Sequence, residues 1–196
     1  MKKNSVFRRE AREVLSGQWG LAALCMFIAC VLSVTVSLVP VVGTVLALLL
    51  LPLNFGLTLV FLRLYRGMSI EIPTLFEGFK DYGRIFCTLF LQNLYVWLWS
   101  LLLVVPGIIK SYSYAMTSYI LADRPELKNN AAIEESMRMM DGHKMRLFLL
   151  DLSFIGWGIL CVLTLGIGFL FLSPYMSTAH ASFYEDLKTQ QETTSM

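Results

Sequence analysis

The strongest constraint on this chain is a set of four long apolar stretches. They run over residues 19–39, 41–62, 85–109 and 147–172, and each reaches the ~20 residues that an α-helix needs to cross ~30 Å of hydrocarbon. The chain is 56% apolar and 15% charged, with a mean hydropathy of +0.63, whereas soluble domains have roughly 45–50% apolar and about 25% charged residues. The sequence therefore predicts an all-α fold, a polytopic transmembrane helix bundle.

The number of crossings depends on two breaks, at 105–107 (Val-Pro-Gly) and 166–168 (Gly-Ile-Gly). Each break precedes a moderately polar segment, 108–122 or 169–184. If each of these segments is the second helix of a tight hairpin, the number of crossings rises from four to six. Lys and Arg near membrane ends are enriched on the cytoplasmic side. Six crossings put every Lys and Arg except Lys110 on that side, whereas four leave a basic loop outside. We therefore predict six spans as three hairpins, with both termini cytoplasmic.

A short amphipathic segment precedes each hairpin and ends near a glycine, at Gly17, Gly83 or Gly142. The apolar sides are Phe7, Ala11, Val14 and Leu15 in the first segment, Leu75, Phe76 and Phe79 in the second, and Ile133, Met137 and Met140 in the third. Charged residues lie on the opposite sides of the first and third segments. This pattern predicts short interfacial helices on the cytoplasmic side, with their apolar faces in the headgroup region.

The same order of segment, hairpin and uncharged outer turn recurs along the chain, with turns at 40–43, 106–107 and 166–168. We interpret residues 1–196 as one integral membrane domain with possible repeat units 1–66, 67–128 and 129–190. The alternative is that any protein built from hairpins looks periodic in this way.

Two charged residues, Lys110 and Asp151, fall inside predicted spans. A charge in hydrocarbon is costly and is usually paired or functional. Each also has a structural interpretation: Lys110 can extend toward the outer surface, and Asp151 can accept hydrogen bonds from a nearby hydroxyl or reach Lys144 or Arg146.

The predicted fourth and sixth helices are rich in Ser, Thr and Tyr. Small hydroxylated residues let helices pack closely and bond to one another, and the sharper alternative is a polar cavity for a headgroup or a small solute. Gln92 and Asn93 on the third helix can line the same cavity, and Pro52 with Asn54 marks an irregularity in the second span. The candidate intramembrane polar site consists of Lys110, Asp151, Tyr112, Tyr114, Tyr119 and His180.

Signatures of catalysis, metal binding and nucleic-acid binding are absent from the sequence. It contains no His-Glu-x-x-His, Gly-x-Ser-x-Gly or phosphate-loop motif, and its four cysteines lie in apolar stretches without a Cys-x-x-Cys pair. A net charge of +2 without a long basic run gives no surface that could follow phosphates. We therefore expect no enzyme, no cofactor, no metal site and no nucleic-acid partner.

Several motifs carry a resemblance to a known family. They are LWSLLLVVPGIIKSYSY at 98–114, YILAD at 119–123, DGHK at 141–144, LLDLSFIGW at 149–157 and LTLGIGF at 163–169. Together they resemble the bacterial membrane proteins grouped as domain of unknown function 975, although Ser118 stands where many relatives are expected to have proline. More distantly, the chain is similar to the membrane domain of glycerophosphodiester phosphodiesterases. The resemblance implies a helix bundle of the bacterial cytoplasmic membrane and no established activity.

Two functions remain open at this point. The first is a non-catalytic membrane module that binds lipid or a protein partner, because three basic segments on one face attract anionic headgroups. The alternative is a small-solute transporter or solute-binding bundle that uses a polar intramembrane cavity, with Lys110 and Asp151 in it.

Overall fold

The computed structural model describes residues 3–37, 50–164, 166 and 168–194. Its helices are α1 (Asn4–Leu15), α2 (Trp19–Ser37), α4 (Leu51–Tyr65), the 3-10 helix η1 (Ile72–Phe79), α5 (Tyr82–Leu102), α6 (Val104–Tyr114), α7 (Thr117–Asp123), α8 (Asn130–Met139), α9 (Lys144–Leu152), α10 (Ile155–Leu163) and α11 (Phe169–Thr194). The described residues contain no strand, so the predicted all-α fold is confirmed.

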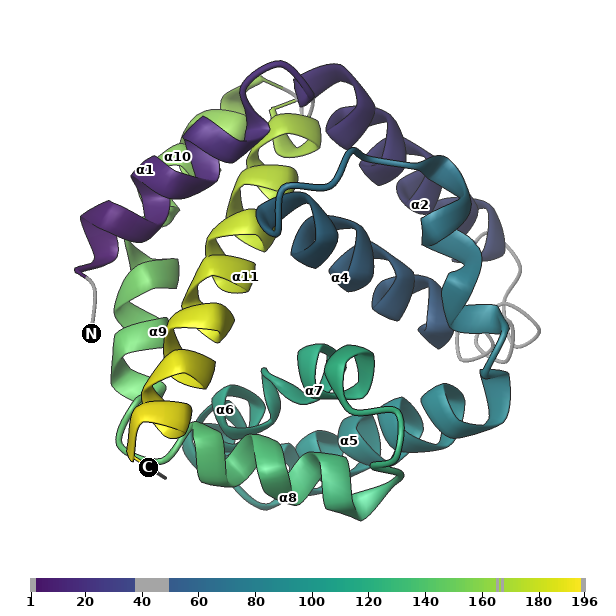
Figure 1. The fold of residues 1–196 in the computed structure, drawn as a ribbon, viewed down its shortest axis with the longest axis vertical. Helices are drawn as coiled ribbons and strands as arrows, with labels where there is room; N and C mark the ends of the chain where they lie inside the picture. Colours follow the sequence, from purple (N-terminus) through teal and green to yellow (C-terminus); the bar gives the residue numbers. More distant parts are fainter. Residues whose placement is uncertain (1–2, 38–49, 165, 167, 195–196) are drawn as a thin grey trace.

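The three amphipathic segments form α1, η1 and α8, and each packs against another helix of the bundle (Figure 1). Helix η1 packs on α4, α8 packs on α7, and α1 packs on α11. The contact of α1 with α11 joins the beginning of the helical bundle to its end. Helix α11 also contacts α4, and α4 contacts α7, so these three helices connect the hairpins to one another.

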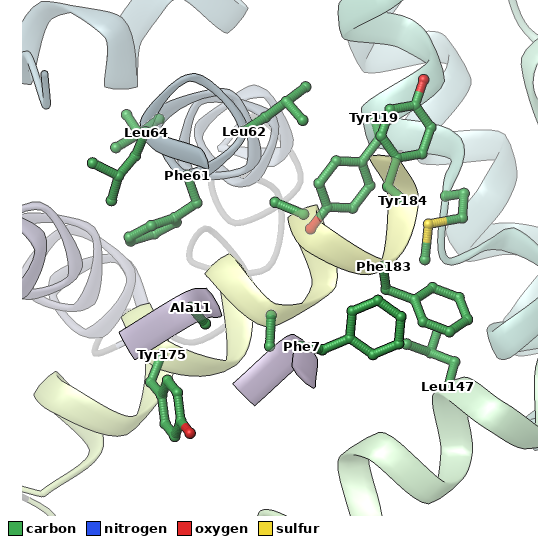
Figure 2. Packing of buried hydrophobic residues seen from close by; sticks show 14 of the residues in the cluster. Phe7, Ala11, Phe61, Leu62, Leu64, Tyr119, Leu147, Tyr175, Phe183 and Tyr184 are labelled. Atoms are coloured by element: carbon green, nitrogen blue, oxygen red, sulfur yellow. The ribbon is translucent and has the colours of Figure 1, made fainter. Parts of the chain in front are cut away.

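The apolar face of α1 is covered by protein. Phe7, Ala11 and Leu15 are completely buried, and the Phe7 ring lies edge-on to Phe183 of α11 with 5.4 Å between the ring centroids (Figure 2). The prediction that this face enters the headgroup region is therefore wrong for α1. A helix that packs on a neighbour and a helix that lies on a membrane both need one apolar face, and the sequence pattern does not separate them.

Helix η1 lies unusually close to α4. A Cβ atom on Gly56 of α4 would collide with the carbonyl oxygen of Leu75, so this crossing requires glycine. Arg63 of α4 then makes two hydrogen bonds to Glu77, of 2.9 and 2.6 Å, and a third of 3.2 Å to Thr74. A bidentate guanidinium–carboxylate pair fixes the orientation of both partners, so this segment is held to the bundle by close packing and by charge.

The turn between α5 and α6 differs from its predicted position. The extended residue is Leu103, with φ −160° and ψ 140°, and Pro106 and Gly107 lie in the first turns of α6. The first N–H groups of a helix have no partner within it, so proline costs nothing there. The same reason explains Pro52, which stands at the beginning of α4 and removes no hydrogen bond from a span.

Two further turn predictions involve residues that are not described. The predicted turn at 40–43 lies wholly outside the described residues, as does the beginning of the predicted span 41–62. In the turn at 166–168, residue 167 lies outside them.

Within residues 3–37, 50–164 and 168–194, two segments are long and apolar enough to cross a membrane: α5, and the consecutive helices α9 and α10 taken together. A third is reached only if α1 and α2, which are bent by 97°, are counted as one broken span. These segments support membrane association by length and composition. They leave the six-span arrangement a prediction.

Candidate polar site between the helices

Asp151 of α9 is the centre of a small polar group formed by three helices. Its Oδ2 atom accepts a hydrogen bond of 3.0 Å from the Tyr112 hydroxyl of α6. Its Oδ1 atom lies 2.6 Å from Nε2 of His180 in α11. The carboxylate thus has one partner on each oxygen, and it is linked to both of the hydroxyl-rich helices predicted from the sequence.

The three side chains are held in place by packing as well as by hydrogen bonds. The Tyr112 ring is perpendicular to Phe148, with 5.8 Å between the centroids. About a quarter of each of the Asp151 and His180 side chains is exposed, at 26% and 28%. The group is therefore fixed by packing and by hydrogen bonds, and it stays partly accessible.

A cavity of about 290 Å³ adjoins His180. Its wall comes from α2, α4, the α6–α7 region and α11, and consists of Met26, Asn54, Leu57, Thr58, Ala115, Ser118, Tyr119, Ser177 and His180. Its volume is near the lower limit of ~300 Å³ for small-molecule sites. The mixture of amide, hydroxyl and imidazole groups suits a small polar solute or a few waters.

Tyr119 completes one side of this cavity from α7. It is only 6% exposed and stacks on Tyr184 of α11, with 5.1 Å between the ring centroids and an interplanar angle of 20° (Figure 2). Gln92 and Asn93, which were also expected at the cavity, are not part of its wall. Asn93 instead donates to the carbonyl of Leu89 within α5.

Lys110 and Tyr114 form a second group on the opposite side of α6. The Lys110 ammonium lies 5.2 Å from the centroid of the Trp99 ring and 6.0 Å from that of Tyr114. Residues four apart, such as Lys110 and Tyr114, share a helix face. Tyr112 is two positions from Lys110 and therefore lies about 160° around the helix axis from it. The six predicted site residues are therefore divided into two groups, with Asp151, His180, Tyr112 and Tyr119 in one and Lys110 and Tyr114 in the other.

Sequence reasoning missed a second buried carboxylate, Asp123, at the end of α7. Its side chain is only 8% exposed, and its Oδ2 atom accepts bonds from Arg66 (2.7 Å), Lys188 (2.7 Å) and Tyr184 (3.1 Å). Burial raises the pKa of Asp123, but the bonds from Arg66 and Lys188 outweigh it and hold the pKa below its usual value. The signal in the sequence was an acidic residue directly after a predicted span, 108–122.

No group of three or more His, Cys, Asp or Glu side chains that could hold a metal ion occurs within the described ranges. The cluster around Asp123 contains one further carboxylate, Glu185, which also pairs with Arg66 at 2.6 Å. Its cations are already paired with acids of the same chain, which is the pattern of a structural network.

Comparison with protein families gives a match in the second half of the chain. Residues 101–191 match the family described as "Protein of unknown function (DUF975)", which confirms the resemblance to that family. The matched part contains both groups of the predicted polar site. No curated protein and no solved structure matches the chain, and the predicted distant similarity to glycerophosphodiester phosphodiesterases stays a prediction.

Proposed function

We propose that the chain acts as a non-catalytic, membrane-embedded module of the bacterial cytoplasmic membrane that binds lipid. The family that residues 101–191 match is described as one of unknown function, so the proposal is argued from the geometry. Two segments long and apolar enough to cross a bilayer support this proposal.

The observation that carries it is the apolar surface at the ends of two hairpins. More than half of each side chain is exposed at Trp97, Leu98, Leu101, Leu102, Leu103, Val104 and Val105 around the α5–α6 turn, and at Ile155, Trp157, Ile159, Leu160, Val162 and Leu163 along α10. Single exposed apolar residues are ordinary in soluble proteins, but large contiguous patches mark interaction surfaces. Continuous surfaces of this kind, on helices with satisfied backbone hydrogen bonds, suit hydrocarbon.

Depth-dependent quenching tests this proposal. An environment-sensitive fluorophore is attached at Leu101→Cys or Leu163→Cys in a variant without the four native cysteines, and the protein is reconstituted with lipids that carry a nitroxide on the acyl chain. We expect strong quenching at both positions and little at a matched control, Arg138→Cys, whose side chain is 71% exposed. Equal quenching at all three positions would contradict the proposal.

The topology is part of the same proposal: three hairpins enter from the cytoplasmic side and both termini stay there. If every hairpin passes through the whole bilayer, the chain makes six crossings. Arg12, which precedes the first hairpin, lines the same groove as Thr164 at the third turn, whereas opposite membrane surfaces are ~30 Å apart. This proximity favours a third hairpin that enters and leaves on the same side without crossing, which preserves the predicted placement of the basic residues.

Labelling of intact cells with a membrane-impermeant maleimide separates the two forms. Cysteine at Leu103, the extended residue of the α5–α6 turn, is expected to label from outside and cysteine at Arg138 is not. Cysteine at Gly166, in the third turn, labels from outside if there are six crossings and stays unlabelled if the third hairpin is shallow.

A second function, solute binding or transport, is favoured by one specific observation, the polar cavity beside the Asp151–His180 pair. Native mass spectrometry of gently extracted protein tests it. A stoichiometric small molecule that is lost in Asp151→Asn but kept in Lys110→Met would support this function. Asp151 contacts His180, which lines the cavity, whereas Lys110 lies on the opposite side of α6. Wild-type protein without such a molecule would contradict it.

A further inference from the structure

A second hollow, separate from the polar cavity, lies between the α1–α2 junction and the third hairpin. It has a volume of about 500 Å³, within the ~300–1,000 Å³ typical of ligand sites. Arg12 and Trp19 border it on one side, and residues of α10 and α11, with Thr164 and Gly168 between these helices, form the rest of its wall. We call this hollow the Arg12 groove.

The wall of the Arg12 groove is almost entirely apolar. Cys161, Leu172 and Tyr175 form its buried part, each less than 10% exposed. The Tyr175 ring is fixed between Trp19, at 6.4 Å, and Phe154, at 5.1 Å. The groove is therefore a preformed apolar surface with an aromatic side.

The edges of the groove open toward the surface proposed to contact lipid. Trp157, Leu160 and Phe171 line it and are about half exposed, at 51%, 52% and 50%. They continue the apolar surface of α10 described above. A hydrocarbon chain from the bilayer can thus enter the groove without passing through water.

Arg12 supplies an uncompensated positive charge at the border of this apolar wall. It is exposed, and it has no ion pair or hydrogen bond within the described part of the chain. The nearest acid in the sequence, Glu13, is paired with Arg9 at 3.7 Å. Guanidinium groups bind phosphate strongly and with defined geometry, so the charge and the apolar wall are complementary to the two parts of an anionic phospholipid.

We infer that the Arg12 groove binds one anionic phospholipid of the bilayer, with its phosphate at Arg12 and one acyl chain along α10 and α11. This inference rests on the proposed lipid-embedded function and names the lipid class and its site. Trp19 lies at the border between the charged and the apolar parts, where an indole ring is favoured in a membrane interface.

Native mass spectrometry with defined lipids tests the inference. Purified full-length protein is titrated with phosphatidylglycerol and, separately, with phosphatidylcholine of the same acyl chains. We expect one tightly bound phosphatidylglycerol and weaker phosphatidylcholine. Loss of a charge-assisted hydrogen bond between a guanidinium and a phosphate lowers affinity by about tenfold, so Arg12→Gln should lower phosphatidylglycerol affinity by about that factor and leave phosphatidylcholine unchanged.

Arg9→Gln is the matched control, because Arg9 is on the same helix and exposed but does not line the groove. A groove-filling variant, Thr164→Trp, should weaken both lipids, and circular dichroism verifies that each variant is folded. Equal losses in Arg9→Gln and Arg12→Gln, or unchanged binding in Thr164→Trp, would overturn the inference.

Flotation with vesicles of pure phosphatidylcholine distinguishes this failure from failure of the proposed function. Wild-type protein that floats but retains no stoichiometric phosphatidylglycerol would overturn only the groove assignment. Protein that does not float would overturn the membrane function and the groove assignment with it.

Discussion

Asp123 and Asp151 are both carboxylates inside the helical bundle, but they have different partners. Asp123 is nearly inaccessible, and a single oxygen accepts from two cations and a tyrosine. Asp151 is more accessible and has one tyrosine and one histidine, and that histidine also lines a cavity. Full charge compensation is typical of a structural residue such as Asp123, whereas Asp151 has no cation of Lys or Arg among its described partners and lies beside a histidine that lines a cavity.

The difference also separates two parts of the molecule. Asp123 connects α7 to α4 and α11 through Arg66 and Lys188, close to the predicted cytoplasmic ends of these helices. Asp151 connects α9 to α6 and α11 within predicted spans. Asp123 thus joins the ends of helices, whereas Asp151 joins the middle parts of helices.

The largest effect is expected from Asp123→Asn. It leaves Arg66 and Lys188 without their shared acid, and removal of one partner from a buried pair costs about 3–5 kcal/mol. Because each cation is about one-third exposed and Arg66 keeps its pair with Glu185, we expect a loss below this range, about 2 kcal/mol. Thermal unfolding in detergent measures it, with the exposed Asp141→Asn as control. A loss no larger than that of the control would refute the structural role.

The next effect is a dependence of stability on pH. The pKa of Asp123 is lowered in the folded state, so its contribution is fully present above the unfolded value of about 3.9 and is lost as the pH falls through the lower folded value. Unfolding of wild type and Asp123→Asn should therefore converge below about pH 4. A constant difference between the two proteins from pH 7 to pH 3 would contradict this assignment.

A smaller loss of stability is expected from Asp151→Asn. Asparagine can keep a hydrogen bond with Tyr112, and the difference between a charged and a neutral acceptor is about 1 kcal/mol. The same thermal unfolding measurement applies, with Asp123→Asn as the reference. A loss as large as that of Asp123→Asn would remove the distinction between the two carboxylates.

The smallest effect is expected from Lys110→Met. Methionine keeps the apolar contact with Trp99 and removes the cation–π interaction, which contributes about 0.5–1 kcal/mol at an accessible site. Tryptophan fluorescence and thermal unfolding report the change, and Trp99→Leu should give a similar loss that is not additive with it. A loss above about 2 kcal/mol would indicate a charged partner for Lys110.

The fold class was predictable from the sequence, because long apolar stretches alternate with amphipathic segments of helical period, and few folds other than a helix bundle accommodate both. Gly17 and Gly142, which end the first and third segments, have positive φ values of 88° and 73°, as a residue that stops a helix there requires. The surroundings of α1 were not predictable, because its covering residues come from α11, about 170 positions later. Contacts of this separation leave no local pattern.

The candidate site was predictable in composition but not in grouping. The cost of charge in hydrocarbon pointed to Lys110 and Asp151, and the hydroxyl-rich helices pointed to Tyr112 and His180. Helical periodicity alone separates Lys110 from Tyr112. The pair of Asp151 and His180 depends on how α9 and α11 are placed. The position of Arg12 at an apolar groove depends on the assembly of three segments that are distant in the sequence.

The contact between α1 and α11 has a consequence for how the protein is made. The ribosome produces Phe7, Ala11 and Leu15 long before Phe183 and Ser182, whose hydroxyl bonds to Glu10 at 2.6 Å. During translation, the apolar face of α1 therefore has no partner until α11 has been made. Docking of α11 then buries this face, so the packing of the first helix is completed late in synthesis.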